Sequence, residues 1–270
     1  MKSFAIKTNN SQSIEYLENN LKKINLKDVY FSNKNFKHYT NIIVHYKGNN
    51  TQEFMEEIST ILSFLVIYEF EEDFLKQIIS RDFFYFSKHE QDKILDNCFN
   101  IIIDSNTLIK EKFKILFNSF LDFIKENKTI FLSGFVIFRL QPYWDILEKI
   151  VGDAVNGYIL EKEYNEFISL LKLYINSSPT IEDVLHIVYS ANYTIILDSN
   201  KNIINNSQDA FKAKFLSDIS FSTNDYTLNT LLTLLPEKIY VHLVDNKMDE
   251  FITTLSLIFD KRLEICTESI

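Results

Sequence analysis

The scarcity of glycine and proline is the feature of this sequence that most constrains its fold. Only 4 Gly and 3 Pro occur in 270 residues, and neither type occurs between positions 51 and 128. All-β sandwiches and barrels need a turn about every 8–12 residues and use these two residue types to make them. The sequence therefore predicts long helices at its centre.

The central stretch without glycine or proline predicts three helices joined by short connections. Asn50, with Glu53 three residues later, has the pattern of a capped helix start, and apolar residues then recur at helical spacing. Ser87 begins a second helix in the same way. A third helix runs through residues 108–124.

Short β-like runs flank this helical centre. At the N-terminus, a βαββ module consists of a strand at residues 3–8, a helix at 13–24 and strands at 29–31 and 39–46. At the C-terminus, a ββαβαβ module has strands at 184–189, 193–197, 239–244 and 263–266, with helices at 228–235 and 248–259. The last strand–helix–strand unit predicts a parallel pair with a right-handed crossover.

The predicted fold class is therefore α+β and predominantly helical. A small basic βαββ module covers residues 1–50, a helical region covers 51–180, and an α/β module covers 181–270, packed together as one or two domains.

Composition limits the class of protein and the cellular compartment in which it is expected. An apolar fraction of 46% and an aromatic fraction of 14% exclude a disordered chain, and two distant cysteines cannot form a disulfide framework. The most apolar window, residues 58–70, is about 13 residues long, whereas a membrane-spanning helix needs roughly 20. The N-terminus lacks the apolar run of a secretory signal. These features predict a cytoplasmic protein without a membrane span.

Charge is distributed unevenly along the chain. The first 50 residues contain eight lysines and three acidic residues, a net charge of +5, so the remainder carries −14 of the overall −9. The overall negative charge repels phosphate groups and so disfavours nucleic acid as a partner. Residues 27–48 nevertheless interleave lysines with aromatic residues, as single-strand binding surfaces do. Lys27, Lys34, Lys37 and Lys47 are therefore possible anion-binding residues, and the alternative is a solvated sheet edge.

The block GFVIFRLQPYWDILEKIVGDAVNGYILEKEYNEFISLLKLYI, residues 134–175, predicts two amphipathic helical segments. Pro142 fits a first helical turn. The apolar stripe changes phase near residues 159–161, which suggests a bend or short break. Gly152 and Gly157 suggest close packing of another element.

Arg139 is flanked by apolar residues, so we expect a buried guanidinium that needs a carboxylate partner. Glu161, Glu163 and Glu166 are the nearest candidates. Arg139, Glu163 and Glu166 thus predict a structural ion pair, with an anion-binding arginine as the alternative. Arg139→Ala is then expected to destabilise the fold by a few kcal/mol.

Metal, nucleotide and cofactor sites find little support. Glu163 and Glu166 share a helix face, but no histidine completes a dimetal pattern. His186, His242 and Cys266 each fall in a predicted strand, where packed histidines are commoner than zinc ligands. The glycines are isolated, so no phosphate-binding loop exists. We expect no metal and no cofactor.

Several phrases together resemble a known family. GFVIFRLQPYW, LEKEYNEFISLLKLYI, LLTLLPEKIYVHL and IFDKRLEIC resemble the YtxC-like sporulation proteins of endospore-forming bacteria, over about residues 130–266. The resemblance implies a sporulation-associated role and supplies no biochemical activity.

The leading hypothesis is a non-catalytic cytosolic protein with a sporulation-associated role that acts through an unidentified protein partner or as a structural module, because no catalytic constellation is present. A second hypothesis is an enzyme or small-ligand-binding protein with a pocket around Arg139 and residues 161–166. A third is weak binding of an anionic polymer, such as nucleic acid, through residues 27–48. The partner and the oligomeric state do not follow from the sequence.

Overall fold

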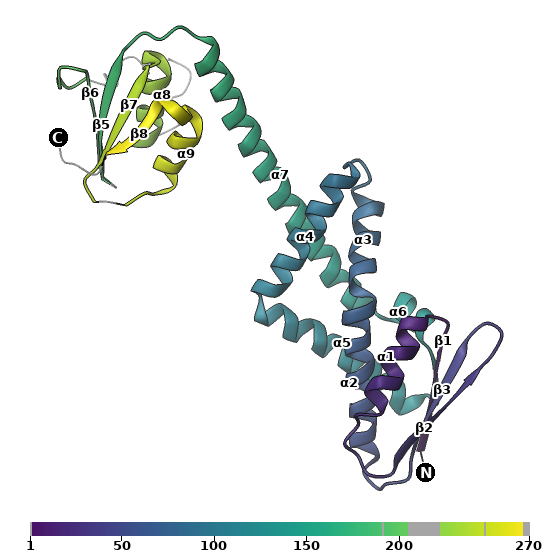
Figure 1. Ribbon diagram of the computed structural model, residues 1–270. Coiled ribbons are helices and arrows are strands. Elements are labelled where there is room, and N and C mark those ends of the chain that lie inside the picture. The colour runs from purple at the N-terminus through teal and green to yellow at the C-terminus, as the bar shows by residue number, and fades with distance from the viewer. Residues whose placement is uncertain (1, 191, 205–221, 246, 267–270) are drawn as a thin grey trace, which may run out of the picture. The chain divides into compact units, whose positions relative to one another are not determined.

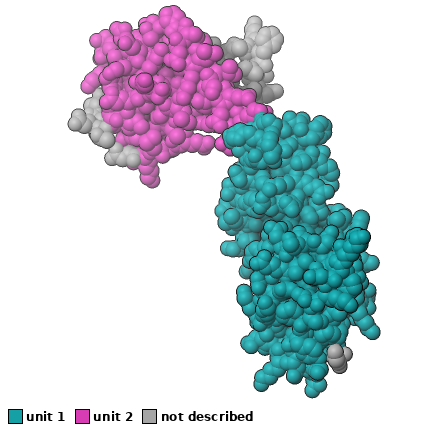
Figure 2. All heavy atoms as spheres, turned by 45° about the vertical axis from the view of Figure 1, so that its right-hand side comes forward, with its two compact units in different colours: residues 1–160 teal, residues 161–270 magenta. Residues whose placement is uncertain are grey.

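The computed structural model describes residues 2–190, 192–204, 222–245 and 247–266. The chain forms two compact units, residues 1–160 and residues 161–270 (Figure 2). The first unit contains β1 (Lys2–Thr8), α1 (Ser11–Leu21), β2 (Val29–Asn35), β3 (Thr40–Tyr46), α2 (Thr51–Glu69), α3 (Glu71–Asp82), α4 (Lys88–Asp104), α5 (Asn106–Glu126), β4 (Thr129–Phe131) and α6 (Leu132–Arg139) (Figure 1). Helix α7 (Gln141–Ser177) begins in the first unit and ends in the second. The second unit continues with β5 (Val184–Ser190), β6 (Tyr193–Leu197), α8 (Thr223–Leu234), β7 (Lys238–Leu243), α9 (Glu250–Phe259), a 3₁₀ turn (Asp260–Arg262) and β8 (Leu263–Cys266). The predicted α+β, mainly helical class is confirmed.

The first sheet has the strand order β2-β3-β1-β4. Strand β3 lies between β1 and β2 and is antiparallel to both, whereas β4 adds to the edge of β1 in parallel. The predicted βαββ elements are all present. Strand β4 is a fourth member that the sequence pattern did not predict, because its three residues are too few to show an alternation.

Four helices, rather than the predicted three, fill residues 51–126 of the first unit. Asn50 and Ser87 cap α2 and α4 as predicted, and Ser87 forms a complete capping box with Glu90. The prediction missed α3. A single residue, Phe70, separates it from α2, and no side chain caps its start. Without a capping residue or a breaker, this boundary leaves no signal in the sequence.

One hydrophobic core serves the first sheet and the helices together. It includes Phe4 and Val44 from the sheet, Leu62 from α2, Phe120 from α5 and Leu147 from α7, all less than 2% exposed. The inward face of the sheet is therefore covered by helices (Figure 1).

Helix α7 is continuous over 37 residues, so of the two alternatives predicted near residues 159–161, a bend or a short break, the break is wrong. Tyr143 to Tyr158 contribute buried residues to the first core, whereas Ile168 and Ile175 belong to the second. The change of phase marks the transfer of the helix from one core to the other. The close packing expected at Gly152 and Gly157 is also absent, because a Cβ built there would meet no described atom within 4 Å.

The second sheet has the strand order β6-β5-β7-β8. Strands β5, β7 and β8 are parallel, as predicted for β7 and β8, and the neighbouring strand β6 pairs with β5 in antiparallel orientation. Leu235 adopts a left-handed conformation (φ 42°) directly before Pro236 and ends α8. In the described part of the chain, each helix is too short or too polar to span a lipid bilayer.

Candidate anion-binding face of the first sheet

The side of the first sheet that points away from the helices carries a distinctive set of side chains. Residues alternate between the two faces of a strand, and Phe4, Ile6, Ile42 and Val44 occupy the buried face. The strand pairing then assigns the opposite positions to a second surface, which we call the outer face. The outer face consists of Ser3, Ala5, Lys7, Tyr30, Ser32, Lys34, Asn41, Ile43, His45, Thr129 and Phe131.

No carboxylate stands among these outer-face positions, although the whole chain carries a net charge of −9. Lys7 and Lys34 lie on the face, and Lys47 follows the end of β3. None of the three lysines forms an ion pair with any residue that the structure describes. Their charges are therefore not neutralised by neighbouring side chains.

Aromatic side chains form a cluster at one end of the outer face, which we call the hairpin cluster. Phe36 and Tyr39 stack with ring centroids 5.0 Å apart, and Phe131 meets the Tyr39 ring edge-on at 5.9 Å. Lys34 lies 5.3 Å from the Phe36 ring centroid, and Lys7 lies 5.4 Å from that of Tyr39. At these separations an ammonium group is attracted to the electron-rich face of a ring.

A smaller cluster, the tyrosine–histidine cluster, lies at the other end. Tyr30 and His45 are paired across β2 and β3, and their rings stack at 5.3 Å. Ser3 forms a hydrogen bond with His45 Nδ1 (2.8 Å) and so fixes the ring. Lys47 lies 5.1 Å from the Tyr30 ring centroid. Both clusters thus combine an aromatic surface with an unpaired ammonium group.

The sequence located this face only in part. Lys34 and Lys47 contribute to it, whereas Lys27 and Lys37 are exposed in the loops before and after β2. Lys7 and Phe131 were not among the predicted residues, because they come from β1 and β4, outside the lysine-rich segment. Their contribution depends on strand pairing, which a single stretch of sequence does not reveal.

Arg139 is exposed at the end of α6, so the expected buried guanidinium is wrong. Its guanidinium lies 5.6 Å from the ring centroid of Phe123 on α5. It forms no ion pair with a described residue of the first unit. Its two apolar neighbours differ in burial: Phe138 is 81% exposed, whereas Leu140 is 0% exposed.

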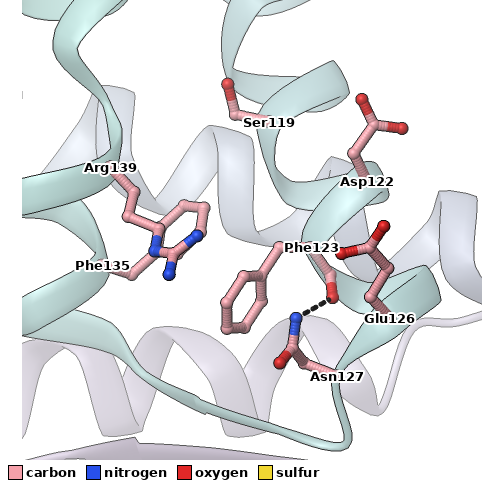
Figure 3. A pocket seen from close by; sticks show the side chains of 7 residues that line it. All are labelled: Ser119, Asp122, Phe123, Glu126, Asn127, Phe135 and Arg139. Carbon is pink, nitrogen blue, oxygen red and sulfur yellow. Dashed lines mark hydrogen bonds between the residues drawn. The ribbon is translucent and has the colours of Figure 1, made fainter.

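Arg139 nevertheless borders a pocket of about 240 Å³ between α5 and α6 (Figure 3). The pocket is lined by Ser119, Asp122, Phe123, Glu126, Asn127, Phe135 and Arg139. Its volume is below the roughly 300–1,000 Å³ of typical ligand sites. Two acidic side chains at its wall also oppose the binding of an anion by Arg139. The outer face is therefore the stronger candidate.

Glu163 and Glu166 lie on α7 within the second unit and are exposed, as is Glu161. Arg139 belongs to the first unit. The ion pair between Arg139 and these glutamates stays a prediction.

A buried polar triad in the first unit was not found by sequence reasoning. Lys112 Nζ on α5 lies 2.7 Å from both carboxylate oxygens of Glu71, the first residue of α3. The Tyr143 hydroxyl, from α7, donates a hydrogen bond to the same carboxylate. Burial and the adjacent carboxylate raise the pKa of Tyr143 well above its usual value. Glu71 is 4% exposed and Lys112 is 2% exposed, so the triad links three helices away from solvent.

The histidines of the second sheet lie side by side. His186 Nδ1 is 3.1 Å from His242 Nε2, and burial, the neighbouring His242 and Lys201 lower the pKa of His186. Cys266 pairs in register with His242. Among the described residues, however, no three histidine, cysteine or acidic side chains are grouped to hold a metal ion.

Comparison with known proteins identifies the family. The sequence model of the YtxC-like family matches residues 56–264, which is most of the chain. This chain belongs to the YtxC-like family. A curated relative, the uncharacterized protein YtxC of Bacillus subtilis (strain 168), is 24% identical over 226 residues, covering 79% of this chain and 76% of the relative. No solved structure matches the chain.

The YtxC-like match begins within α2 and therefore covers more than the phrases that first suggested the resemblance. It does not include β1, α1, β2 or β3. Of the outer-face residues, only Thr129 and Phe131 of β4 lie within the matched region.

Proposed function

We propose that this YtxC-like protein is a non-catalytic, cytoplasmic binding protein with a role in sporulation, and that its outer face binds a negatively charged partner. The observation that carries the binding proposal is the combination of three lysines that form no ion pair with a described residue and the absence of carboxylates from the outer-face positions. In a chain of net charge −9, such a surface is a local positive region that attracts anionic partners. The sporulation role is supported by the resemblance to the YtxC-like sporulation proteins.

The binding proposal is tested with a charge variant of the outer face. Lys7, Lys34 and Lys47 are replaced together by glutamine, and affinity for a fluorescently labelled polyanion is measured across a salt series. Each phosphate contact contributes to the slope of log affinity against log salt. The slope is therefore expected to fall by about 2 when three contacts with a single strand are removed.

A matched control removes the same amount of charge elsewhere on the first unit. Lys110, Lys114 and Lys149 are exposed on α5 and α7 and lie outside the outer face. Their triple glutamine variant is expected to keep the wild-type slope and affinity. Equal losses in both variants, or no polyanion binding by the wild-type protein, would contradict the proposal.

The sporulation role is tested separately. Deleting the gene from its host is expected to reduce the number of heat-resistant spores while leaving vegetative growth unchanged. An unchanged spore count would remove this part of the proposal.

A further inference from the structure

We infer that the partner of the outer face is a single-stranded nucleic acid, whose bases stack on the hairpin cluster and the tyrosine–histidine cluster. This inference rests on the proposed function and specifies its anionic partner.

The exposure of the aromatic rings is the first argument. A surface that attracts polyanions by charge alone needs only lysines or arginines. On this sheet Tyr30 is 40% exposed, Phe36 is 44% exposed and Phe131 is 50% exposed. Exposed rings beside lysines on one sheet surface favour a ligand that offers planar groups as well as negative charge.

The arrangement of rings and charges is the second argument. Each cluster places a lysine ammonium between 5.1 and 5.4 Å from a ring centroid. A nucleotide carries a base and a phosphate a short distance apart, so one ring and one ammonium group can engage the two parts of the same nucleotide. An acidic peptide would satisfy the lysines and leave the rings without a matching group.

The separation of the clusters is the third argument. His45 lies six positions after Tyr39 along β3 and the turn before it, which corresponds to about 20 Å at the usual rise per strand residue. Such a span exceeds one nucleotide, so a strand crossing the sheet can engage both clusters. Sheet surfaces that bind RNA stack two or three bases in this manner.

Single-stranded rather than duplex nucleic acid fits this surface. In a duplex the faces of the bases are hidden by stacking, and only their edges are accessible in the grooves. The outer face is the surface of a sheet (Figure 1). No described helix of the first unit projects from this surface in a way that would let it enter a groove of duplex DNA. Rings on a sheet require splayed bases, which single strands supply.

The experiment compares four labelled probes by fluorescence anisotropy at fixed salt, using the full-length protein. The probes are mixed-sequence single strands of about 12 nucleotides, one of DNA and one of RNA, the corresponding DNA duplex, and a DNA strand of equal length whose sites are all abasic. An unlabelled polyglutamate peptide is added as a competitor. The abasic strand retains the phosphates and lacks the bases, so it isolates the contribution of stacking.

Ring variants complete the test. Tyr30→Leu, Phe36→Leu and Phe131→Leu retain apolar surface and remove the ring, and each is expected to weaken single-strand binding by roughly 5- to 150-fold. The control variants Phe84→Leu and Tyr85→Leu alter rings that are 74% and 63% exposed on the loop after α3. They are expected to bind as the wild type does. Circular dichroism confirms that every variant is folded.

The outcomes separate the inference from the proposed function. The inference is supported if the wild-type protein binds DNA or RNA single strands more tightly than the abasic strand and the duplex. This preference must be lost in the ring variants and kept in the control variants. Equal affinity for the single strand and the abasic strand overturns it and leaves general anion binding intact. Effective competition by polyglutamate, with unchanged affinity in the ring variants, also overturns it in favour of an acidic protein. Absence of binding to every probe overturns both.

Discussion

We expect the first unit to be destabilised more by removal of the positive charge from the buried triad than by replacement of all three triad residues with apolar ones. The variant Lys112→Met keeps the length of the side chain and leaves the carboxylate of Glu71 buried without its counter-charge. Breaking a buried ion pair in this way costs about 3–5 kcal/mol, because the remaining charge stays desolvated. The Tyr143 hydroxyl still donates to Glu71 and does not neutralise it.

The magnitude can be converted into a shift of the melting temperature. A domain of 150–250 residues loses about 2–4 °C for each kcal/mol. The first unit has 160 residues, so Lys112→Met is expected to lower its midpoint by roughly 6–20 °C. Trp144 reports on this unit alone, since it is the only tryptophan and packs 4.4 Å from the ring centroid of Phe74 within the first core.

The matched control replaces all three members by apolar residues of similar size. In the variant Glu71→Leu, Lys112→Met, Tyr143→Phe, the triad no longer contains a charge or hydroxyl that needs a partner. Such replacements of buried ion pairs are often neutral or stabilising, so the triple variant should be more stable than Lys112→Met alone. Urea unfolding followed by Trp144 fluorescence gives both free energies. The reasoning fails if Lys112→Met costs less than about 1 kcal/mol, or if the triple variant is the less stable of the two.

Three further variants test single features of the structure. Between about pH 9 and pH 11 the stability of the wild type should fall more than that of Tyr143→Phe. The pKa of Tyr143 is raised in the folded state, so its contribution to stability is complete below the unfolded pKa of about 10 and is lost as the pH rises above it. Urea midpoints measured across this pH range check the difference. Arg139→Ala should lower the free energy of unfolding by only about 0.5–1 kcal/mol, the contribution of an exposed cation–π contact, instead of the several kcal/mol expected for a buried charge. A larger loss in urea unfolding would instead support a buried ion pair at Arg139. Gly157→Ala should raise stability by about 0.5–1 kcal/mol, because a Cβ there meets open space within α7; calorimetry showing a lower midpoint would indicate that another element packs there.

Periodic patterns predicted the elements whose signal is local. The alternation of β3 and the three- and four-residue spacing of α5 are visible in short windows, and both elements were predicted close to their observed positions. Strand β4 is too short to show an alternation, and it exists through its pairing with β1. Helix α3 does have apolar residues at helical spacing (Phe74, Leu75, Ile78 and Ile79), but it follows α2 without a capping side chain, so its start could not be located.

Charged residues were the least predictable, because burial of a charge is decided by elements distant in sequence. Glu71 begins the acidic run EED, and Lys112 ends the run KEK, so both resemble solvated helix surface. The prediction for Arg139 was wrong in the opposite direction, since a side chain expected to be buried is exposed. Successive side chains on a helix diverge by about 100°, so the apolar neighbours of an arginine do not place it on the same face. Flanking residues indicate whether a side chain is buried only when they lie on the same face of the helix as that side chain.

The two faces of the first sheet have separable physical roles, which makes the binding proposal testable. The inner face contributes Phe4, Ile6, Ile42 and Val44 to the core, each 1% exposed or less, and these residues hold the sheet on the helices. The lysines of the outer face form no ion pair with any residue in the described ranges, so the fold does not depend on neutralising them. Concentrating unpaired positive charge and half-exposed rings on one surface brings little stability. A change of binding in outer-face variants can therefore be attributed to the surface itself rather than to loss of the fold.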